Sequence, residues 1–359
     1  MRHQQGTAQT VTLVVISILV LASPAFAGDC PELVGALGFQ YAADVAVSGN
    51  YAFVAWTDFS GEGGLRVFDV SDPYHPVEVG FVDFDWGAPR AVAVSGSYAY
   101  VADPAIGWGI LRVIDVSEPT APVQVGSVEV GDAQDVAVSG DYAYVVNWGF
   151  FGSGSFTVID VSEPTAPVPV GYLGGSRRGV AVSGGYAYDV GDYYFEVIDV
   201  SDPWAPVQVG GLYSSAGGYG VAVSGGYAYV AFPDASGLLS RGLDVIDVSE
   251  PTAPVEVGFL DTPTSAWDVA VSRGYAYVVV GDEFTGGLYV IDVSTPSAPV
   301  EAGYHEAGQA DDIVGGIAVS GGHVFLANWG GLFVFRECGW LFFDGFESGD
   351  TSAWSATVP

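Results

Sequence analysis

The 359-residue chain contains no lysine, and its nine arginines are outnumbered by 42 aspartate and glutamate residues, which gives a formal net charge of −33. Without lysine, any reaction that needs a lysine amine as nucleophile or Schiff-base former is excluded. An acidic field of this size repels phosphate backbones, so nucleic acid is not an expected partner. The acidity suits a saline or calcium-containing exterior, and solubility alone is also a sufficient reason for it.

Histidine and cysteine are scarce as well, with four and two residues. The three histidines beyond the first 27 residues lie in three different repeats, and no GxSxG, HExxH or phosphate-binding glycine loop occurs. The sequence therefore assigns no catalytic residue, metal ligand or cofactor and favours a non-enzymatic protein. Catalysis stays open, because an enzyme built from scattered axial residues would carry no motif.

Long apolar runs are missing except at the amino terminus. Arg2 and His3 precede the run VTLVVISILVLA, and Ala25-Phe26-Ala27 provides a small-x-small cleavage site. Residues 1–27 therefore predict a signal peptide for bacterial-type export, with a secreted, periplasmic or cell-surface protein that begins near Gly28. No transmembrane segment is expected in that mature chain.

Two short blocks recur along the rest of the sequence. VIDVSEPTAPVQVG at 113–126 returns, with few changes, at 67, 158, 197, 245 and 290. A second block, VAVSGxYAYV, precedes each copy, and its start positions are spaced 41 to 48 residues apart: Val45, Val92, Val136, Val180, Val221, Val269 and Ile317. Each period holds four strand-like runs joined by Gly and Pro turns, which predicts an all-β fold, a seven-bladed β-propeller of four-stranded antiparallel blades, over residues 28–338.

The ends of the chain predict how the ring closes. The seventh repeat stops after its third strand, and residues 31–35 (PELVG) match the fourth strand of the other repeats. The N-terminal strand should therefore complete the last blade and cover two exposed strand edges. Cys30 and Cys338 flank the break, so a disulfide between them would replace the missing EPTAP turn. Residues 339–359 form a short tail, whose role as a sorting or docking segment or as a cover over the propeller stays open.

The two blocks together resemble the LVIVD repeat. This repeat is found in secreted and surface-associated β-propeller proteins of bacteria and archaea, and the resemblance covers about residues 31–337. It implies the fold and an extracytoplasmic location and no particular reaction. The seventh repeat departs from it, with Arg336 where the other repeats carry Asp.

The repeats separate a constant face from a variable one. The SG hairpins and EPTAP turns share one end of the blades, here called the turn face, while the second-to-third loops and the interblade loops share the other, the loop face. Recognition usually resides in loops on a rigid scaffold, and the loop face is expected to gather six tryptophans: Trp56, Trp86, Trp108, Trp148, Trp267 and Trp329. They either anchor a protein or glycan partner or cap the apolar ends of the blades.

Two sets of carboxylates recur at fixed places in the repeat. The Asp of VIDVS (Asp69, Asp115, Asp160, Asp199, Asp247 and Asp292) lies far from the axis, so it should accept backbone N–H bonds from the following turn rather than form a metal ring. Asp44, Asp135 and Asp268 should begin innermost strands near the central channel, with Arg90 and Arg178 close by. These three carboxylates are expected to pair with the two arginines and water, and calcium binding is the alternative.

Three functional hypotheses follow. The first is an exported non-enzymatic scaffold that binds an extracellular protein or glycan through its loop face. The second is an extracellular hydrolase or lyase that uses the axial carboxylates, for which an axial pocket and a strongly raised carboxyl pKa would speak. A purely structural surface protein is the third possibility.

Overall fold

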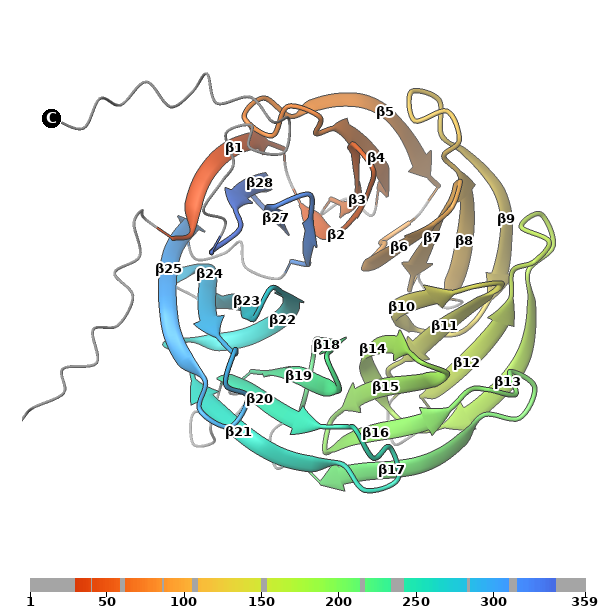
Figure 1. Ribbon diagram of the computed structural model, residues 1–359. Helices are drawn as coiled ribbons and strands as arrows, with labels where there is room; N and C mark the ends of the chain where they lie inside the picture. The colour runs from red at the N-terminus through yellow and green to blue at the C-terminus, as the bar shows by residue number, and fades with distance from the viewer. Residues whose placement is uncertain are drawn as a thin grey trace, which may run out of the picture.

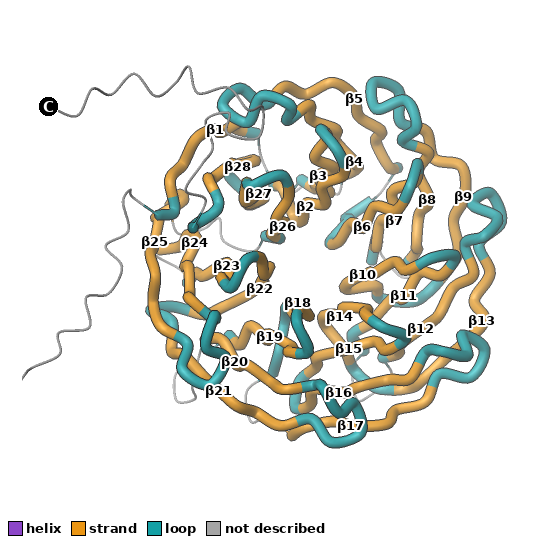
Figure 2. The backbone as a smooth tube through the Cα atoms, viewed as in Figure 1, coloured by secondary structure: helices purple, strands orange, loops and turns teal. Residues whose placement is uncertain are grey.

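The computed structural model describes residues 30–339 except 40, 59–61, 86, 105–108, 150–153, 214–216, 234–241, 283–284 and 310–314. The predicted signal peptide and all of the predicted tail but Gly339 lie outside these residues. Within the described ranges, no helix is long and apolar enough to cross a membrane. Strand makes up most of the described backbone, with short turns and loops between the strands (Figure 2).

Seven four-stranded antiparallel sheets surround a central axis (Figure 1). The innermost strands are β2 (Ala42–Ser48), β6 (Ala91–Ser95), β10 (Ala133–Ser139), β14 (Arg177–Ser183), β18 (Val221–Ser224), β22 (Ser265–Ser272) and β26 (Ile317–Ser320). The second strands are β3 (Tyr51–Thr57), β7 (Tyr98–Asp103), β11 (Tyr142–Asn147), β15 (Tyr186–Gly191), β19 (Tyr227–Phe232), β23 (Tyr275–Gly281) and β27 (His323–Asn328).

The outer half of each blade is the VIDVSEPTAPVQVG block. The third strands are β4 (Gly63–Asp69), β8 (Ile110–Asp115), β12 (Ser155–Asp160), β16 (Tyr194–Asp199), β20 (Gly242–Asp247), β24 (Thr285–Asp292) and β28 (Gly331–Arg336). The outermost strands are β5 (Val77–Phe84), β9 (Val123–Glu129), β13 (Val168–Gly174), β17 (Val207–Tyr213), β21 (Val255–Asp261), β25 (Val300–Gln309) and β1 (Glu32–Gly38). The predicted seven-bladed propeller is confirmed.

The apolar core is divided among the contacts between neighbouring blades. Each of the seven buried clusters draws its side chains from two adjacent blades, so every sheet is covered on both faces. Between the first two blades, for example, Phe53 and Leu65 pack against Val101 and Ile114. This packing explains why the second and third strands are apolar on both sides rather than alternating.

The glycine that ends each PVxVG run has a steric reason. A Cβ atom at Gly80 would overlap the carbonyl oxygen of Pro119 in the EPTAP turn of the next blade, and Gly126 stands in the same relation to Pro164. At the last contact, Gly303 meets the carbonyl oxygen of Cys30. Cys30 therefore takes the place of the turn that the chain break removes.

The repeated Asp of VIDVS has the structural role predicted for it. In all six blades that carry it, its Oδ1 accepts the backbone N–H of the Ser two residues later at 2.9 Å. Hydrogen bonds from that serine's hydroxyl and backbone hold the pKa of this carboxyl below its usual range in five blades: Asp69, Asp115, Asp160, Asp199 and Asp247.

The closing seam is built as predicted. Strand β1 pairs antiparallel with β28 and completes the sheet of β26, β27 and β28. Cys30 and Cys338 form a disulfide, with their Cα atoms 5.8 Å apart, within the range that a disulfide spans without backbone movement. The backbone N–H of Cys338 also donates a 2.8 Å hydrogen bond to the Tyr277 hydroxyl of the neighbouring blade.

The two residues before Cys338 depart from the repeat, and each finds a partner. Arg336, in place of Asp, forms a 2.8 Å ion pair with Glu32 on the closing strand. Glu337, in place of a buried Val, is itself buried and lies 3.4 Å from Arg273 of the sixth blade. Arg273 has a φ of 52° at a hairpin position that is Gly140 in the third blade, with a φ of 58°. A non-glycine residue is uncommon in this conformation, and here its side chain forms the ion pair with Glu337.

Candidate functional site

A cavity of about 480 Å³ occupies the loop-face end of the central axis. Its lining comes from the starts of the innermost strands, together with Trp329 from the second-to-third loop of the seventh blade. Its size falls in the range of small-molecule and cofactor sites, which are about 300–1,000 Å³.

Each blade contributes one residue to the upper wall of this cavity. The residue occupies the same place in every repeat, two positions before the first Val or Ile of VAVS, and we call the seven together the collar. The collar consists of Ala43, Arg90, Gln134, Arg178, Tyr219, Trp267 and Gly315. Apart from the two arginines, no residue type occurs twice in the collar. The VAVS block that begins two positions later barely varies.

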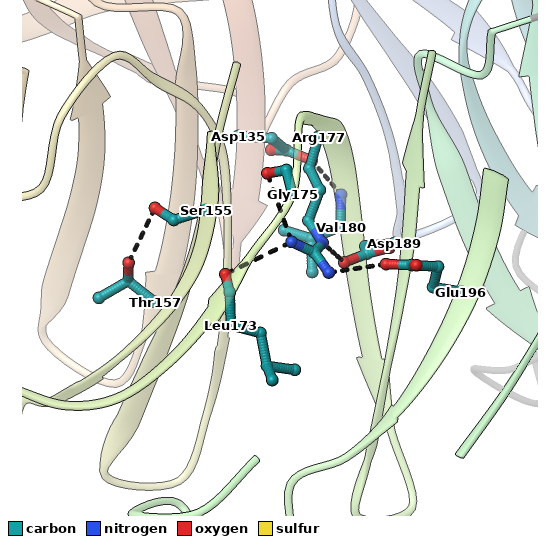
Figure 3. A network of polar contacts seen from close by, with 9 residues as sticks. All are labelled: Asp135, Ser155, Thr157, Leu173, Gly175, Arg177, Val180, Asp189 and Glu196. Carbon is teal, nitrogen blue, oxygen red and sulfur yellow. Dashed lines mark hydrogen bonds and ion pairs between the residues drawn. The ribbon is translucent and has the colours of Figure 1, made fainter. Parts of the chain in front are cut away.

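The next residue of each blade forms a second ring, which we call the axial ring. It consists of Asp44, Ala91, Asp135, Gly179, Gly220, Asp268 and Gly316. Asp135 accepts the backbone N–H of Val136 in its own blade at 2.7 Å and that of Val180 in the next blade at 2.8 Å. Figure 3 shows this second bond from the third blade to the fourth.

The other two axial carboxylates bridge blades in the same way. Asp44 accepts from its neighbour Val45 at 2.7 Å and from Val92 of the second blade at 2.8 Å. Asp268 likewise accepts from Val269 at 2.8 Å and, across to the seventh blade, from Ile317 at 3.0 Å. Each carboxylate therefore ties two innermost strands together with both of its oxygen atoms.

The predicted pairing of these carboxylates with the two arginines is wrong among the described residues. Arg178 instead forms a 3.0 Å ion pair with Asp192 and donates to the Tyr219 hydroxyl at 2.6 Å. Arg90 donates to the side-chain oxygen of Gln134. The backbone N–H groups of the next blade, which the sequence alone does not place, take the role expected of the arginines.

Burial gives the axial carboxyls unusual acidities. They keep some surface toward the cavity, but protein surrounds them on the other sides, and this desolvation raises the pKa of Asp135 to about 6 and that of Asp268 to about 7. The pKa of Asp44 is raised well above its usual value by burial and then by the negative charge of Asp268. The backbone hydrogen bonds act in the opposite direction without cancelling the effect.

Aromatic rings and a guanidinium form a continuous stack along one side of the collar. The Arg178 guanidinium lies 5.1 Å from the Trp148 ring centre and 4.4 Å from that of Tyr219. Tyr219 in turn meets Trp267 edge to face, with ring centres 5.0 Å apart. Trp267 is held in place by a 3.1 Å bond from its Nε1 to the carbonyl oxygen of Gly281. The stack gives this wall of the cavity a fixed shape.

The remaining predicted tryptophans divide into two groups. Trp56 lies under the Arg66 guanidinium, 4.5 Å from it, away from the cavity lining. Trp329 lines the cavity and meets Tyr41 edge to face at 5.5 Å. Trp86 and Trp108 lie outside the described residues. The four of these six predicted tryptophans that lie within the described residues are all half-buried.

A buried ionic network fixes the strand that carries Arg178. The neighbouring Arg177 is buried between blades, where it pairs with Asp189 and, at 2.6 Å, with Glu196 (Figure 3). Burial raises the pKa of Asp189 to about 7, despite the opposing effect of Arg177. The register of β14 is irregular between Arg177 and Gly179; Arg177 is buried in this network, whereas Arg178 lines the cavity.

The comparisons with known proteins agree with this architecture. The LVIVD-repeat family model matches residues 40–83, 87–130, 130–172, 174–212, 218–262, 263–306 and 307–335. The chain belongs to the LVIVD-repeat family. No curated protein sequence matches it.

One solved structure similar to this LVIVD-repeat protein is that of the computationally designed Ika8 protein. The two share 12% sequence identity and a TM-score of 0.58, over 85% of this chain and 99% of the designed one. At this level of identity the likeness concerns the fold alone. Membership of the family therefore accounts for the repeated scaffold of the chain.

Tyr219, Gln134 and Asp192 are site residues of the LVIVD-repeat protein that sequence reasoning missed. The residues expected at the site from the sequence alone are charged or tryptophan side chains. The position before the axial residue varies from blade to blade inside an otherwise constant block. This variation is the sequence signal that points to Gln134 and Tyr219. Asp192 is recognisable only through its contact with Arg178.

The raised axial pKa values predict a mildly acidic optimum of stability for the LVIVD-repeat protein. A carboxyl whose pKa is higher in the folded state stabilises the fold below its unfolded pKa of about 3.9 and loses this contribution as the pH rises. For Asp135 and Asp268 the loss should begin above about pH 4 and be complete once the pH has risen through about 6 and about 7, respectively. The carboxyls with lowered pKa, such as Asp115, act in the opposite direction and lose their contribution only as the pH falls below about 4.

Denaturant unfolding from pH 3 to 9 checks this prediction. The free energy of unfolding should be greatest near pH 4 and should decline between about pH 4 and 7. The double variant Asp135→Asn/Asp268→Asn should flatten the decline between about pH 4 and 7. A stability that rises steadily from pH 5 to 8 would show that the axial carboxyls do not titrate in this range.

Proposed function

We propose that this protein is an exported, non-enzymatic binding scaffold that receives an extracellular glycan in its axial cavity. The observation that carries the proposal is the collar. One position of a highly repetitive sequence differs from blade to blade, and its residues line a single cavity. Blade packing alone does not require Arg, Gln, Tyr and Trp at equivalent positions of different blades, whereas recognition of an asymmetric ligand does.

The form of the site favours a glycan over a folded protein partner. Protein interfaces need large, exposed anchor residues, but Trp148, Trp267 and Trp329 are half-buried and their rings pack against neighbours. A sugar ring presents an apolar C–H face and a rim of hydroxyl groups. It can therefore lie against the aromatic stack while its hydroxyls reach Gln134 and Arg90.

Export is part of the proposal and rests on two features. The first 27 residues have the composition of a signal peptide. The Cys30–Cys338 disulfide closes the ring, and structural disulfides are typical of oxidising compartments outside the cytoplasm. The resemblance to surface-associated propellers points in the same direction.

A hydrolase or lyase at the axis is the second candidate function. An axial cavity and raised carboxyl pKa values are the features it requires, and both are present. Against it, both oxygens of Asp44, Asp135 and Asp268 already accept backbone N–H groups, which suits them to hold the blades together. Release of sugar fragments from a bound glycan, lost in Asp268→Asn, would favour this candidate.

A glycan array tests the proposal with a matched pair of tryptophan variants. Trp267 lies in the collar, whereas Trp204 is 64% exposed in a turn on the opposite face. We expect the wild type and Trp204→Ala to bind the same cell-wall and exopolysaccharide fragments, and Trp267→Ala to lose at least tenfold in affinity because its stacking surface is gone. Thermal melting of both variants controls for folding.

Two outcomes of the array would contradict the proposal. If no glycan on the array binds, the ligand is not a glycan of the kinds tested. Equal binding by Trp267→Ala and the wild type, with the same melting behaviour, would place recognition elsewhere. Binding of a protein at the collar would mean that the partner is a protein and not a glycan.

A further inference from the structure

The arginines of this acidic chain divide into six that are paired with carboxylates and one that is not. Seven arginines lie within the described residues, and six of them form ion pairs: Arg66, Arg112, Arg177, Arg178, Arg273 and Arg336. Arg90, in the collar, is the one described arginine without a carboxylate partner. In a chain with 42 acidic residues and nine arginines, a cation left unpaired at a cavity mouth requires an explanation.

Arg90 is held in position without being neutralised. Its Nη1 donates to Oε1 of Gln134, whose Nε2 donates to the carbonyl oxygen of Asp132 at 3.1 Å. This chain of bonds orients the Gln134 amide and, through it, the guanidinium. A neutral carboxamide leaves the full positive charge of Arg90 available, and four of its five N–H donors are left for a ligand.

The other cation of the collar contrasts with it. Arg178 is compensated by Asp192 and enclosed between Trp148 and Tyr219, so it forms part of the wall. Arg90 is exposed and lines the same cavity. Among the described residues of the collar, Arg90 is therefore the charged side chain without a carboxylate partner that a ligand lying against Tyr219 and Trp267 could reach.

We infer that the axial cavity recognises a saccharide that bears a carboxylate, a uronic-acid residue, and that Arg90 is the group that binds this carboxylate. The inference rests on the glycan-binding function proposed above and adds its chemical class. Arg matches a carboxylate through two parallel N–H···O bonds, which a neutral sugar does not offer. The net charge of −33 disfavours anions at long range, but salt confines this repulsion to about 8 Å at physiological ionic strength.

Calorimetric titration with matched sugars tests the inference. The probes are di- and trisaccharides of galacturonic, glucuronic and mannuronic acid, each beside its carboxyl-reduced counterpart, which keeps the same stereochemistry without the charge. We expect at least one acidic saccharide to bind at least tenfold more tightly than its reduced form. Arg90→Gln should bring this ratio close to one, because it removes the charge and keeps a polar side chain.

Arg66→Gln is the control for the change in net charge. Arg66 is paired with Glu78 and lies outside the cavity lining, so this variant should keep the wild-type ratio. The inference is overturned if no acidic saccharide is preferred, or if Arg90→Gln and Arg66→Gln preserve the preference equally. If only neutral glycans bind, and their binding depends on Trp267, the proposed glycan-binding function is supported but the inference of a uronic acid is wrong.

The pH dependence provides a second readout. The charged groups that face the ligand are Asp44, Asp135 and Asp268 below it, and Arg90 and Arg178 with its partner Asp192 at the collar. A bound anion favours the protonated form of the axial carboxyls. The preference for the acidic over the reduced saccharide should therefore increase as the pH falls from 8 to 5.5, while the carboxylate of the sugar itself stays ionised. A preference that decreases over this range would contradict the placement of the anion above the axial ring.

Discussion

Replacement of both cysteines by serine is expected to lower the free energy of unfolding, because it removes the cross-link that closes the ring. Cys30 and Cys338 are 308 residues apart in sequence, so the disulfide restricts nearly the whole unfolded chain. The chain-entropy account gives at most about 4–5 kcal/mol for such a loop. Without the bond, strand β1 is held to β28 only by its backbone ladder, the side-chain packing and the Glu32–Arg336 ion pair.

Denaturant unfolding of the Cys30→Ser/Cys338→Ser variant checks this expectation. Both cysteines are replaced so that no free thiol is left at the seam. The wild type treated with a reductant should unfold at the same midpoint as the double variant, well below the oxidised protein. Identical midpoints for the oxidised wild type and the variant would mean that packing alone closes the ring.

Asp135→Ala is expected to destabilise the fold, because it removes the acceptor that joins two neighbouring blades. The change leaves the backbone N–H groups of Val136 and Val180 without their acceptor, and each unsatisfied buried N–H costs about 1–3 kcal/mol. Removal of a buried charge offsets part of this loss at neutral pH. A net loss of about 2–4 kcal/mol is expected, with Asp44→Ala and Asp268→Ala in the same range.

Asp132→Ala provides the control for this prediction. Asp132 is exposed three residues earlier in the same blade, and only its backbone takes part in the bonds described above. Its replacement removes the same charge and should change stability by less than about 0.5 kcal/mol. If the two variants unfold at the same denaturant concentration, the axial carboxylates do not bridge the blades.

Much of the architecture could be predicted from the sequence because the repeat is both local and regular. The spacing of VAVS and VIDVS gives the blade count and strand order, and the break in the seventh copy locates the closing strand. The pairing of Cys30 with Cys338 follows from that break. The turn-capping role of residues such as Asp115 was predictable too, since donor and acceptor are two residues apart.

The steric role of the repeated glycine is not visible in any single repeat. Gly80 is required because Pro119, 39 residues later, brings its carbonyl oxygen against the Cα atom. The partner belongs to a different blade and only the assembled ring brings them together. The same holds for Glu337 and Arg273, two departures from the repeat that make sense only as a pair.

The candidate site was harder to predict than the fold for a related reason. The axial carboxylates were expected to meet Arg90 and Arg178 because opposite charges near one axis attract. Their oxygens are instead used by Val92, Val180 and Ile317 of the next blades, and backbone donors carry no signal in a sequence. Of the six predicted tryptophans, Trp267 and Trp329 line the axial cavity, and their partial burial depends on side chains from neighbouring blades.

Oxidative footprinting of tryptophans with and without an array-selected glycan tests the central claim, that the ligand is bound at the collar. Trp267 and Trp329 line the axial cavity, and Trp204 is exposed on the turn face. The account predicts that saturating glycan slows the oxidation of Trp267 and Trp329 several-fold and leaves the rate at Trp204 unchanged. Protection of Trp204 with unchanged rates at Trp267 and Trp329 would contradict it.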